Sequence, residues 1–463
     1  MINPMILCRL SIRQQKRIQE IEMEYPEIDI NELGGIIAEG IFKPALVVPA
    51  LLEAVEIMGP FAVDKGQIIW HYSSKDGVWK EDGEAELTRR VEFCAGDKYR
   101  ANQVQQVASL LRVRIPEILD LGNKSYLNLK NGMLNWKTCE LVPHDPRFFS
   151  IYQINAKWDP QATCPTIDAW MNETFEPDVL PLMWQVIGVV IHPDMGFQKT
   201  VVLLGDGYNG KGTFLKIPEA LLPKSARTSV DPGDFGSDRF ASSDLFLKTA
   251  NICGDIEGIV IESTSKLKQL TGNDVVSAQR KFRDRFDFLS QATLLFAANK
   301  MPPSPDTSHG WMRRWLIIPM TKTIEGGPDA TLSDRMALEL DGAVVKAVKG
   351  LQNAMAKGAF DEPRVCSEAL EEYKNSSDSS AMFINESLDF SIEHKIPISR
   401  AYLYDRYVQF SKQRRLPTDS KGLFWEKVEQ KGHFSVRDSH IYVPKKERAY
   451  IGLKITSSYG GIF

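Results

Sequence analysis

Residues 201–213 read VVLLGDGYNGKGT, a short apolar run followed at once by a glycine-rich segment. The apolar residues Val201–Leu204 are typical of a buried strand. Residues 205–211 fit the P-loop pattern G-x-x-x-x-G-K, in which backbone N–H groups surround phosphate oxygens and the lysine contacts the outer phosphates. A helix beginning near Lys211 would add its positive N-terminal end. The stretch therefore predicts an α/β domain that binds a nucleoside triphosphate.

Two details of this stretch depart from the usual loop. The position after the lysine is normally Ser or Thr, whose hydroxyl binds Mg²⁺, but here it is Gly212, and the first hydroxyl belongs to Thr213. Pro218 is expected to kink or shorten the helix after its second turn. The alternative to a nucleotide site is a glycine-rich turn that binds nothing. The residues predicted to bind ATP are Gly205, Gly207, Asn209, Gly210, Lys211, Gly212 and Thr213.

The bulk composition is that of a globular protein with room for two to four domains. The chain has 463 residues, of which 43% are hydrophobic and 25% charged. No apolar stretch approaches the 18 or more residues of a membrane span, and the N-terminus has no clear secretory signal. Its cysteines are scattered singly, so a zinc ribbon or disulfide framework is not expected, and we predict a cytoplasmic protein. They are Cys8, Cys94, Cys139, Cys164, Cys253 and Cys366.

Charge is distributed unevenly along the chain, although the net charge is only −4. From Lys395 to the end there are 14 Lys and Arg residues against 6 Asp and Glu residues, whereas the rest has 42 against 54. A basic C-terminal module on an acidic body suits contact with phosphate, although a solvated charged face would give the same count.

The pattern along the chain alternates between helical and strand-like segments. Residues 1–60 look mostly helical, and residues 66–80 predict a hairpin around Lys75-Asp76-Gly77. Residues 126–160 look strand-rich, residues 165–195 helical with Trp170 in the core, and residues 200–320 alternate strands with helices. One amphipathic helix is expected over 333–358, followed by a linker over 373–380. Two short helices and a hairpin after residue 399 predict a winged helix-turn-helix.

Polar residues follow two of the expected strands in the central region. The segment ANICGDIEG offers Asp255 and Glu257, and the segment ATLLFAAN (292–299) leaves Asn299 at the end of an apolar run. Hydrolysis of ATP needs one carboxylate for Mg²⁺ and a group that orients the attacking water. Asp255 and Glu257 are candidates for the carboxylates, and Asn299 for the water. Surface acids in a loop and a plain turn residue are the alternatives.

Basic residues occur in two further groups. Lys268 and Lys281 belong to a stretch in which Lys and Arg alternate with phenylalanines, as in loops that hold a nucleic-acid backbone. Arg313 and Arg314 precede the apolar run Leu316–Ile318, where one guanidinium could reach the γ-phosphate of a neighbouring subunit as an arginine finger. Solvated side chains and structural salt bridges are the alternatives.

In this order the blocks resemble the superfamily 3 helicases of phages, plasmids and DNA viruses. The likeness is greatest to the primase-helicase family of satellite phages, plasmids and poxviruses. The matching blocks are GDGYNGKGT, NICGDIEG, KQLTGND with the later Lys281, LLFAAN and WMRRWLIIP, all between residues 205 and 319. Residues 126–146 and 158–173 resemble the domain that precedes the helicase in this family. Residues 338–360 and 371–386 resemble the stretch that follows it. The resemblance spans residues 66–445.

The resemblance implies a P-loop AAA+-like motor domain over residues 166–325. It also implies an N-terminal α+β domain (1–165), a helical extension and linker (326–385) and a basic winged helix (386–463). The implied motor is a homo-oligomeric ring, a hexamer, that hydrolyses NTP at subunit interfaces and moves 3′ to 5′ on single-stranded DNA. Its cofactors would be ATP and Mg²⁺, its substrates single-stranded and forked DNA, with no membrane partner.

The resemblance also assigns roles to residues of this sequence. Lys211 would contact the β- and γ-phosphates, and Asp255 and Glu257 would serve Mg²⁺ and the attacking water, with the division between them left open. Thr213 or a water molecule would replace the usual magnesium hydroxyl, and Asn299 would act as the sensor. Arg313 or Arg314 would be the finger. Lys268 and Lys281 would touch DNA in the channel.

Three readings of the function compete. The first is a replicative helicase of a phage or mobile element. Because the chain has no Asp-x-Asp motif and no zinc-cysteine set, priming would come from a separate primase or initiator. The second is a nucleotide-binding replication initiator or DNA-binding scaffold that does not unwind, which Gly212 would suit. The third is a P-loop kinase or another small-molecule NTPase, which would not need the paired arginines or the basic C-terminal module.

Overall fold

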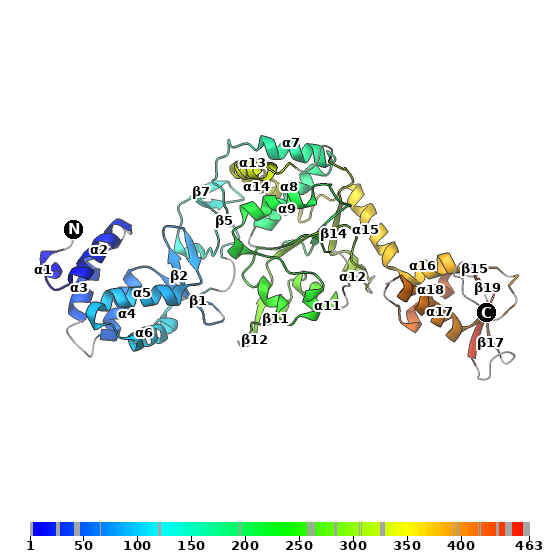
Figure 1. Ribbon diagram of the computed structural model, residues 1–463, viewed down its shortest axis with the longest axis horizontal. Coiled ribbons are helices and arrows are strands. Elements are labelled where there is room, and N and C mark those ends of the chain that lie inside the picture. Colours follow the sequence, from blue (N-terminus) through cyan, green and yellow to red (C-terminus); the bar gives the residue numbers. More distant parts are fainter. Residues whose placement is uncertain are drawn as a thin grey trace.

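The computed structural model gives an elongated mixed α/β chain (Figure 1). A helical N-terminal part lies at one end, a parallel five-stranded sheet occupies the centre, and a small C-terminal unit lies at the other end. The structure describes residues 3–24, 28–40, 47–64, 66–118, 122–192, 194, 196–256, 261, 264–281, 285–304, 306, 308–324, 329–391, 393–394, 396, 398–414, 416, 418–431, 435–439 and 447–456. Within these ranges, no helix is both long enough and apolar enough to cross a bilayer.

The N-terminal part packs helices against one face of a small sheet. Its apolar core takes one stripe of side chains from each helix, as expected for amphipathic helices. The hairpin predicted over 66–80 is confirmed, with Ser73 opposite Val78 and Gly77 at a positive φ of 65°. The helices are α1 (Pro4–Leu7), α2 (Ile12–Glu24), α3 (Ile30–Gly40), α4 (Val47–Ile57), α5 (Gly83–Ala95) and α6 (Ala101–Arg114). The sheet has the order β3-β2-β1-β4, made of β1 (Phe61–Asp64), β2 (Ile69–Ser73), β3 (Val78–Lys80) and β4 (Glu117–Ile118).

A second antiparallel sheet joins the N-terminal part to the centre. Its strands β5 (Tyr126–Leu129), β6 (Gly132–Asn135) and β7 (Glu140–Val142) lie in chain order, and their apolar side chains belong to the same buried cluster as the central sheet. Because Leu129 pairs with Gly132, a two-residue turn connects β5 to β6. The strand-rich prediction for this region is confirmed.

The central sheet decides where the predicted site residues lie. Its strands are β8 (Thr200–Leu204), β9 (Arg227–Thr228), β10 (Ala250–Cys253), β13 (Thr293–Ala298) and β14 (Trp315–Pro319). They are parallel in the order β14-β8-β13-β10-β9. All of β13 is buried, as expected for a strand covered on both faces. The flanking helices include α7 (Pro165–Thr174), α8 (Leu180–Ile191) and α9 (Lys211–Leu221), together with α11 (Thr264–Leu270) and α12 (His309–Met312).

Three predictions about helices were wrong. The single helix expected over 333–358 is two helices, α13 (Leu332–Ala337) and α14 (Leu340–Lys357), although Gly358 does end the second at φ 71°. The linker expected over 373–380 is helical in α15 (Arg364–Ser377) and α16 (Ser379–Ser387), with only Asp378 between them. Of the two effects expected at Pro218, a kink or a shortening, the shortening does not occur, because α9 continues to Leu221 and the Pro218 carbonyl still accepts the N–H of Leu222.

The C-terminal unit has a core of aromatic side chains. Tyr407 and Phe424 stack with centroids 4.4 Å apart, and Phe383 meets both rings edge-on or tilted. The two predicted helices are present as α17 (Arg400–Gln413) and α18 (Lys421–Lys431). The predicted hairpin is present as β17 (Ser435–Ser439) paired with β18 (Glu447–Ile451). Strand β16 (Ile398–Ser399) adds to β18, and β15 (Leu388–Phe390) pairs with β19 (Leu453–Ile455).

Candidate functional site

The glycine-rich loop joins β8 to α9 in a conformation that only some residues can adopt. Gly210 caps α9 at φ 87°, the left-handed region that glycine enters without strain. A Cβ on Gly205 would lie 2.1 Å from Asn209 Nδ2 and 2.4 Å from the Met320 carbonyl oxygen, so this position excludes a side chain. Asn209 is buried and donates from Nδ2 to the Met320 carbonyl at 3.0 Å. Contacts with Met320, the residue that follows β14, therefore fix the conformation of the loop.

The ammonium group of Lys211 lies inside the curve of this loop. It donates to the carbonyl oxygen of Asp206 at 2.8 Å and to Asn209 Oδ1 at 3.0 Å, and it also contacts the Gly205 carbonyl. Lys211 is the first residue of α9, whose opening N–H groups have no partner within the helix. A lysine and a helix N-terminus thus converge where a phosphate chain would bind.

Strand register brings two of the predicted catalytic residues to the same edge. Leu204 pairs with Ala298, so Gly205 and Asn299 follow their strands side by side. Cys253 pairs with Phe296, and the Ile256 N–H donates to the Ala297 carbonyl at 3.0 Å, which places Asp255 level with Ala298. Neighbouring strands are about 4.8 Å apart, so the Asp255 backbone lies roughly 10 Å from the loop, two strands away. The structure therefore groups Lys211, Asn299 and Asp255.

Asp255 is exposed and has a positive φ of 61°, a conformation in which Asp is found more often than most residues. The described residues contain no group of three acidic, His or Cys side chains that could enclose a metal. Mg²⁺ does not require one, since it commonly binds through one or two protein oxygens, phosphates and water. Asp255 and the half-buried Thr213 fit that donor set. Glu257 lies outside the described residues.

Gly212 faces open space at the start of α9. A Cβ at this position would meet nothing within 4 Å, and its backbone is helical. The same freedom from contact holds for Gly207. Neither glycine is therefore required by packing, in contrast to Gly205 and Gly210.

A cavity of about 750 Å³ opens directly against the loop. Trp170 of α7 forms part of its wall; only 4% of this residue is exposed, and its indole N–H has no hydrogen-bond partner among the described atoms. The sequence pattern placed Trp170 in the core but gave no signal that it lines a cavity, because α7 precedes the loop by about 35 residues. The other residues that line the cavity include Tyr208, Gly210, Thr213, Lys216, Glu173, Ile324, Ser333 and Arg335.

The paired arginines lie at the other edge of the sheet. Trp315 pairs with Thr200 and Pro319 with Leu204, so Arg313 and Arg314 precede β14 whereas the glycine-rich loop follows β8. Five residues of strand separate the two edges by roughly 16 Å. Arg314 donates to Thr271 Oγ1 at 3.1 Å and to the Gly310 carbonyl, and burial together with the charge of Arg313 lowers its pKa. Arg313 is exposed, with one contact to Gln198 Oε1 at 3.2 Å.

The two predicted DNA-binding lysines lie in different surroundings. Lys268 of α11 forms an ion pair with Asp306, which also accepts from Thr264 Oγ1 at 2.9 Å. Burial opposes the ionisation of Asp306, but these donors and Ser308 outweigh it and hold its pKa at about 2. Lys281 lies at the turn of a hairpin formed by β11 (Val275–Gln279) and β12 (Arg285–Leu289). The hairpin position suits contact with a polymer, and Lys268 pairs with Asp306 within the chain.

Parts of the chain match known families and folds. Residues 51–176 match the family described as D5 N terminal like, and residues 203–314 match a family of unknown function, DUF5906. The first match overlaps residues 126–146 and 158–173, which resemble the helicase-preceding domain. Two structures of the NrS-1 C terminal region, both described as apo, align at 10% identity over 87% of this chain and 98% of the other, with TM-scores of 0.51 and 0.50. The chain shares their fold.

Proposed function

We propose that the chain is an ATP-dependent replicative DNA helicase of a phage or mobile element, built as a ring that moves on single-stranded DNA. The observation that carries the proposal is the convergence of Lys211, Asn299 and Asp255 at one edge of the parallel sheet. The D5 N terminal like match and the fold shared with the NrS-1 C terminal region support a primase-helicase relative. The resemblance of the sequence blocks supplies the finer class, superfamily 3.

The nucleotide would bind with its phosphates in the loop and its nucleoside in the adjoining cavity. Lys211 and the α9 N-terminus would hold the β- and γ-phosphates. Mg²⁺, when bound through Thr213 and Asp255, neutralises charge that develops on the transferred phosphate. Asn299 would orient the attacking water. The cavity of about 750 Å³ lies within the roughly 300–1,000 Å³ range of small-ligand pockets, and Trp170 would form part of its wall.

The position of the arginines supports the proposed ring. Because Arg313 lies at the opposite edge from the loop of its own chain, it can act at a γ-phosphate only on a second copy. We propose a homo-hexamer with Arg313 as the finger, and Arg314 as the residue that anchors its segment through Thr271 and Gly310. Lys281 at the hairpin turn would contact DNA in the channel.

The C-terminal unit is proposed as a winged helix. Its strands have the order β16-β18-β17, and α17 and α18 lie between β16 and β17 in the chain. In this arrangement α18 corresponds to a recognition helix and β17–β18 to the wing. The proposed partners of the whole chain are forked DNA and a separate primase or initiator.

The direct test of the nucleotide site is the Lys211→Ala variant. Loss of the ammonium group is expected to abolish ATP turnover, because a charged phosphate contact disappears. The matched control is Lys349→Ala, an exposed lysine of α14 far from the loop in sequence. Turnover by Lys211→Ala equal to that of the control would overturn the assignment.

The second candidate function is a nucleotide-binding initiator or scaffold that does not unwind DNA. Gly212 favours it, because the usual magnesium hydroxyl is missing from this position. Tight binding of ATP and duplex DNA without ATP turnover would favour the initiator or scaffold over the helicase.

A further inference from the structure

A cleft of about 1150 Å³ separates the N-terminal part from the central domain, away from the P-loop cavity. The β2–β3 hairpin and the start of α5 form one wall. The segment leading into β10 and the turn of the β11–β12 hairpin form the other. Its volume is larger than the roughly 300–1,000 Å³ of pockets that enclose small ligands, and it suits a stretch of extended polymer.

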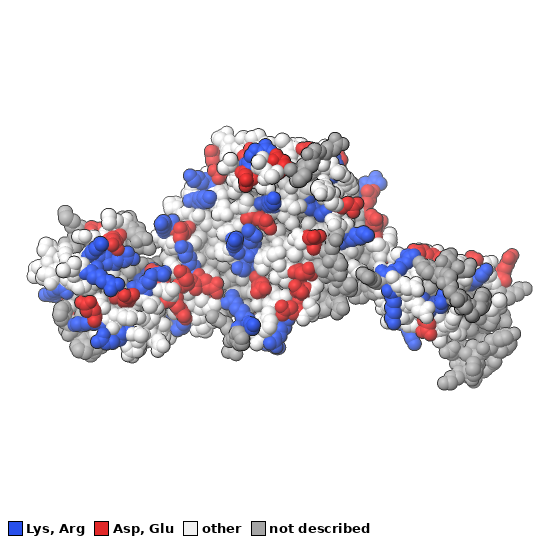
Figure 2. All heavy atoms as spheres, in the orientation of Figure 1, with Lys and Arg blue, Asp and Glu red and all other residues white. Residues whose placement is uncertain are grey.

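The two walls carry opposite charge. The central wall has four basic residues, Arg227, Lys248, Arg280 and Lys281, and one acidic residue, Asp244. The N-terminal wall has three acidic residues, Asp76, Glu81 and Asp82, and one basic residue, Lys80. Figure 2 shows acidic side chains gathered where the N-terminal part meets the centre and basic side chains over the lower end of the centre. The central wall alone would therefore attract a polyanion.

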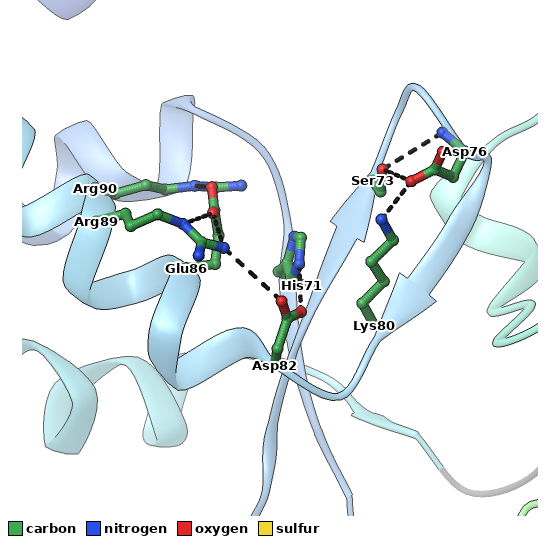
Figure 3. Close-up of polar contacts among 8 residues, drawn as sticks. All are labelled: His71, Ser73, Asp76, Lys80, Asp82, Glu86, Arg89 and Arg90. Carbon is green, nitrogen blue, oxygen red and sulfur yellow. Dashed lines mark hydrogen bonds and ion pairs between the residues drawn. The ribbon is translucent and has the colours of Figure 1, made fainter. Parts of the chain in front are cut away.

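Two of the acidic residues already have partners within their own wall. Asp76 pairs with Lys80 and accepts from Ser73 Oγ at 2.8 Å (Figure 3). Asp82 lies 2.8 Å from His71 Nε2 and 3.8 Å from an Arg89 nitrogen. Glu81 lies between Lys80 and Asp82 in the sequence, but its carboxylate reaches across the cleft, 3.7 Å from an Arg280 nitrogen. Glu81 is thus the acid of the N-terminal wall that pairs with the central wall.

Two aromatic rings orient the Arg280 guanidinium in a way that suits binding of an anion. Its guanidinium lies over the Phe246 ring at 5.2 Å and the Phe286 ring at 5.7 Å, which fixes its plane. The ion pair with Glu81 is accessible to solvent, since the two side chains are 27% and 53% exposed. Exposed ion pairs contribute little to stability, so a multivalent anion can displace Glu81.

Other groups on the central wall also favour an anion beside Arg280. Burial lowers the pKa of Lys248, the carboxylate of Glu81 opposes that shift, and Arg280 adds to it. If Glu81 leaves, Asp244 remains as an acidic neighbour of Arg280 and Lys248, and another anion can take the place of Glu81 beside the two cations. Phe240 lies half-buried on the same wall with Arg239 stacked 4.5 Å over its ring, an arrangement on which a base can stack.

We propose that single-stranded DNA binds the basic wall of this cleft and that its phosphates replace Glu81 as the partner of Arg280. The proposal rests on the helicase function proposed above. It extends the DNA path beyond Lys281 to Arg227, Lys248, Arg280 and Phe240, and it makes Glu81 a competitor that the DNA must displace.

The test is binding of a fluorescent oligothymidylate to the full chain, measured by anisotropy across a salt series. Glu81→Gln removes the competing charge and is expected to tighten binding about threefold. Arg280→Gln is expected to weaken it and to reduce the salt slope by about 0.7, the share of one phosphate contact. In the double variant that carries Glu81→Gln and Arg280→Gln, the Glu81 change is expected to give no increase in affinity over Arg280→Gln alone. The control is Glu84→Gln, because Glu84 pairs with Arg112 outside the cleft and should leave affinity unchanged.

The outcomes separate this proposal from the function on which it rests. If wild-type protein binds and Lys281→Ala weakens binding, while Glu81→Gln and Arg280→Gln both bind as wild type does, the DNA path does not extend from Lys281 to Arg280 and the proposal is overturned. If neither the wild type nor any variant binds the oligonucleotide at low salt, the helicase function itself is wrong and the cleft proposal falls with it.

Discussion

At the scale of single residues, the glycines of the loop differ in what their positions require. Gly205 packs against Asn209 and the Met320 carbonyl, whereas Gly212 faces open space in a helical backbone. Gly205→Ala is therefore expected to lower the free energy of unfolding by about 1–3 kcal/mol, because a buried methyl group must displace the loop from its neighbouring strand. Urea unfolding measures this, and a wild-type midpoint would contradict the packing.

The same contrast makes Gly212→Ser a test of the magnesium site. A serine fits without a clash and is a better helix residue than glycine by up to about 1 kcal/mol, so the fold should be unaffected or slightly more stable. Its hydroxyl would supply the usual magnesium ligand, and we expect the Mg²⁺ concentration for half-maximal ATP turnover to fall several-fold. An unchanged magnesium dependence would show that position 212 does not face the metal.

Lys268 is a residue for which the structure suggests a role inside the fold. Its partner Asp306 has a pKa held at about 2, below the ordinary value of 3.8. A depressed carboxyl pKa contributes stability that is present above about pH 4 and lost as the pH falls toward 2.

Asp306→Asn is therefore expected to lower the free energy of unfolding by about 1 kcal/mol at pH 7, a value reduced for partial exposure of the ion pair. The difference from wild type should disappear as the pH approaches 2. Urea unfolding at a series of pH values measures it, with Asp405→Asn, on the exposed face of α17, as the control. A difference in the free energy of unfolding that does not change with pH would show that the charge of the Asp306 carboxylate does not contribute to stability.

Sequence reasoning predicted the relative position of residues that depend on chain order and missed contacts that depend on distant packing. The P-loop, Asp255 and Asn299 follow apolar strands, so the strand pattern alone predicted that they would share an edge. Trp170 lines the cavity beside the loop because two separate segments pack together, and Lys268 pairs with Asp306 for the same kind of reason. No local pattern in the chain encodes either contact.

At the scale of elements, the break between α13 and α14 has an identifiable cause. The carboxylate of Glu339, in the break, accepts the backbone N–H groups of Thr166 at 2.9 Å and Ile167 at 3.2 Å, and the Thr166 hydroxyl at 2.6 Å. It thereby satisfies the N-terminus of α7, on a different segment. Periodicity predicted one helix because the apolar stripe continues through the break; the competing contact is 173 residues away.

Glu339→Ala should remove that cap. We expect a loss of about 1–2 kcal/mol in the free energy of unfolding, because buried N–H groups at the start of α7 lose their acceptor. Glu339→Gln, which keeps a carbonyl oxygen, should lose less. Hydrogen exchange at the first turn of α7 reports the effect locally, and equal protection in Glu339→Ala and wild type would refute the capping role.

At the scale of the whole molecule, the two edges of the sheet separate the phosphate-binding loop from the exposed Arg313. Under the proposed function, a complete site therefore needs two copies of the chain. Arg313→Ala is expected to bind ATP with wild-type affinity but to hydrolyse it at least tenfold more slowly, since arginine fingers typically contribute 10³-fold or more.

Mixing Arg313→Ala with Lys211→Ala protein should restore part of the activity, because some interfaces would combine an intact loop with an intact arginine. Neither variant alone should be active. An absence of recovery at any mixing ratio would contradict a site shared between subunits.

The measurement that tests the central claim most directly is ATP turnover by the purified full chain, with and without single-stranded DNA, alongside its mass in solution. The account predicts turnover that DNA stimulates strongly in an assembly of several copies. A monomer that binds ATP and duplex DNA but shows no turnover under either condition would contradict the motor and leave the scaffold in its place.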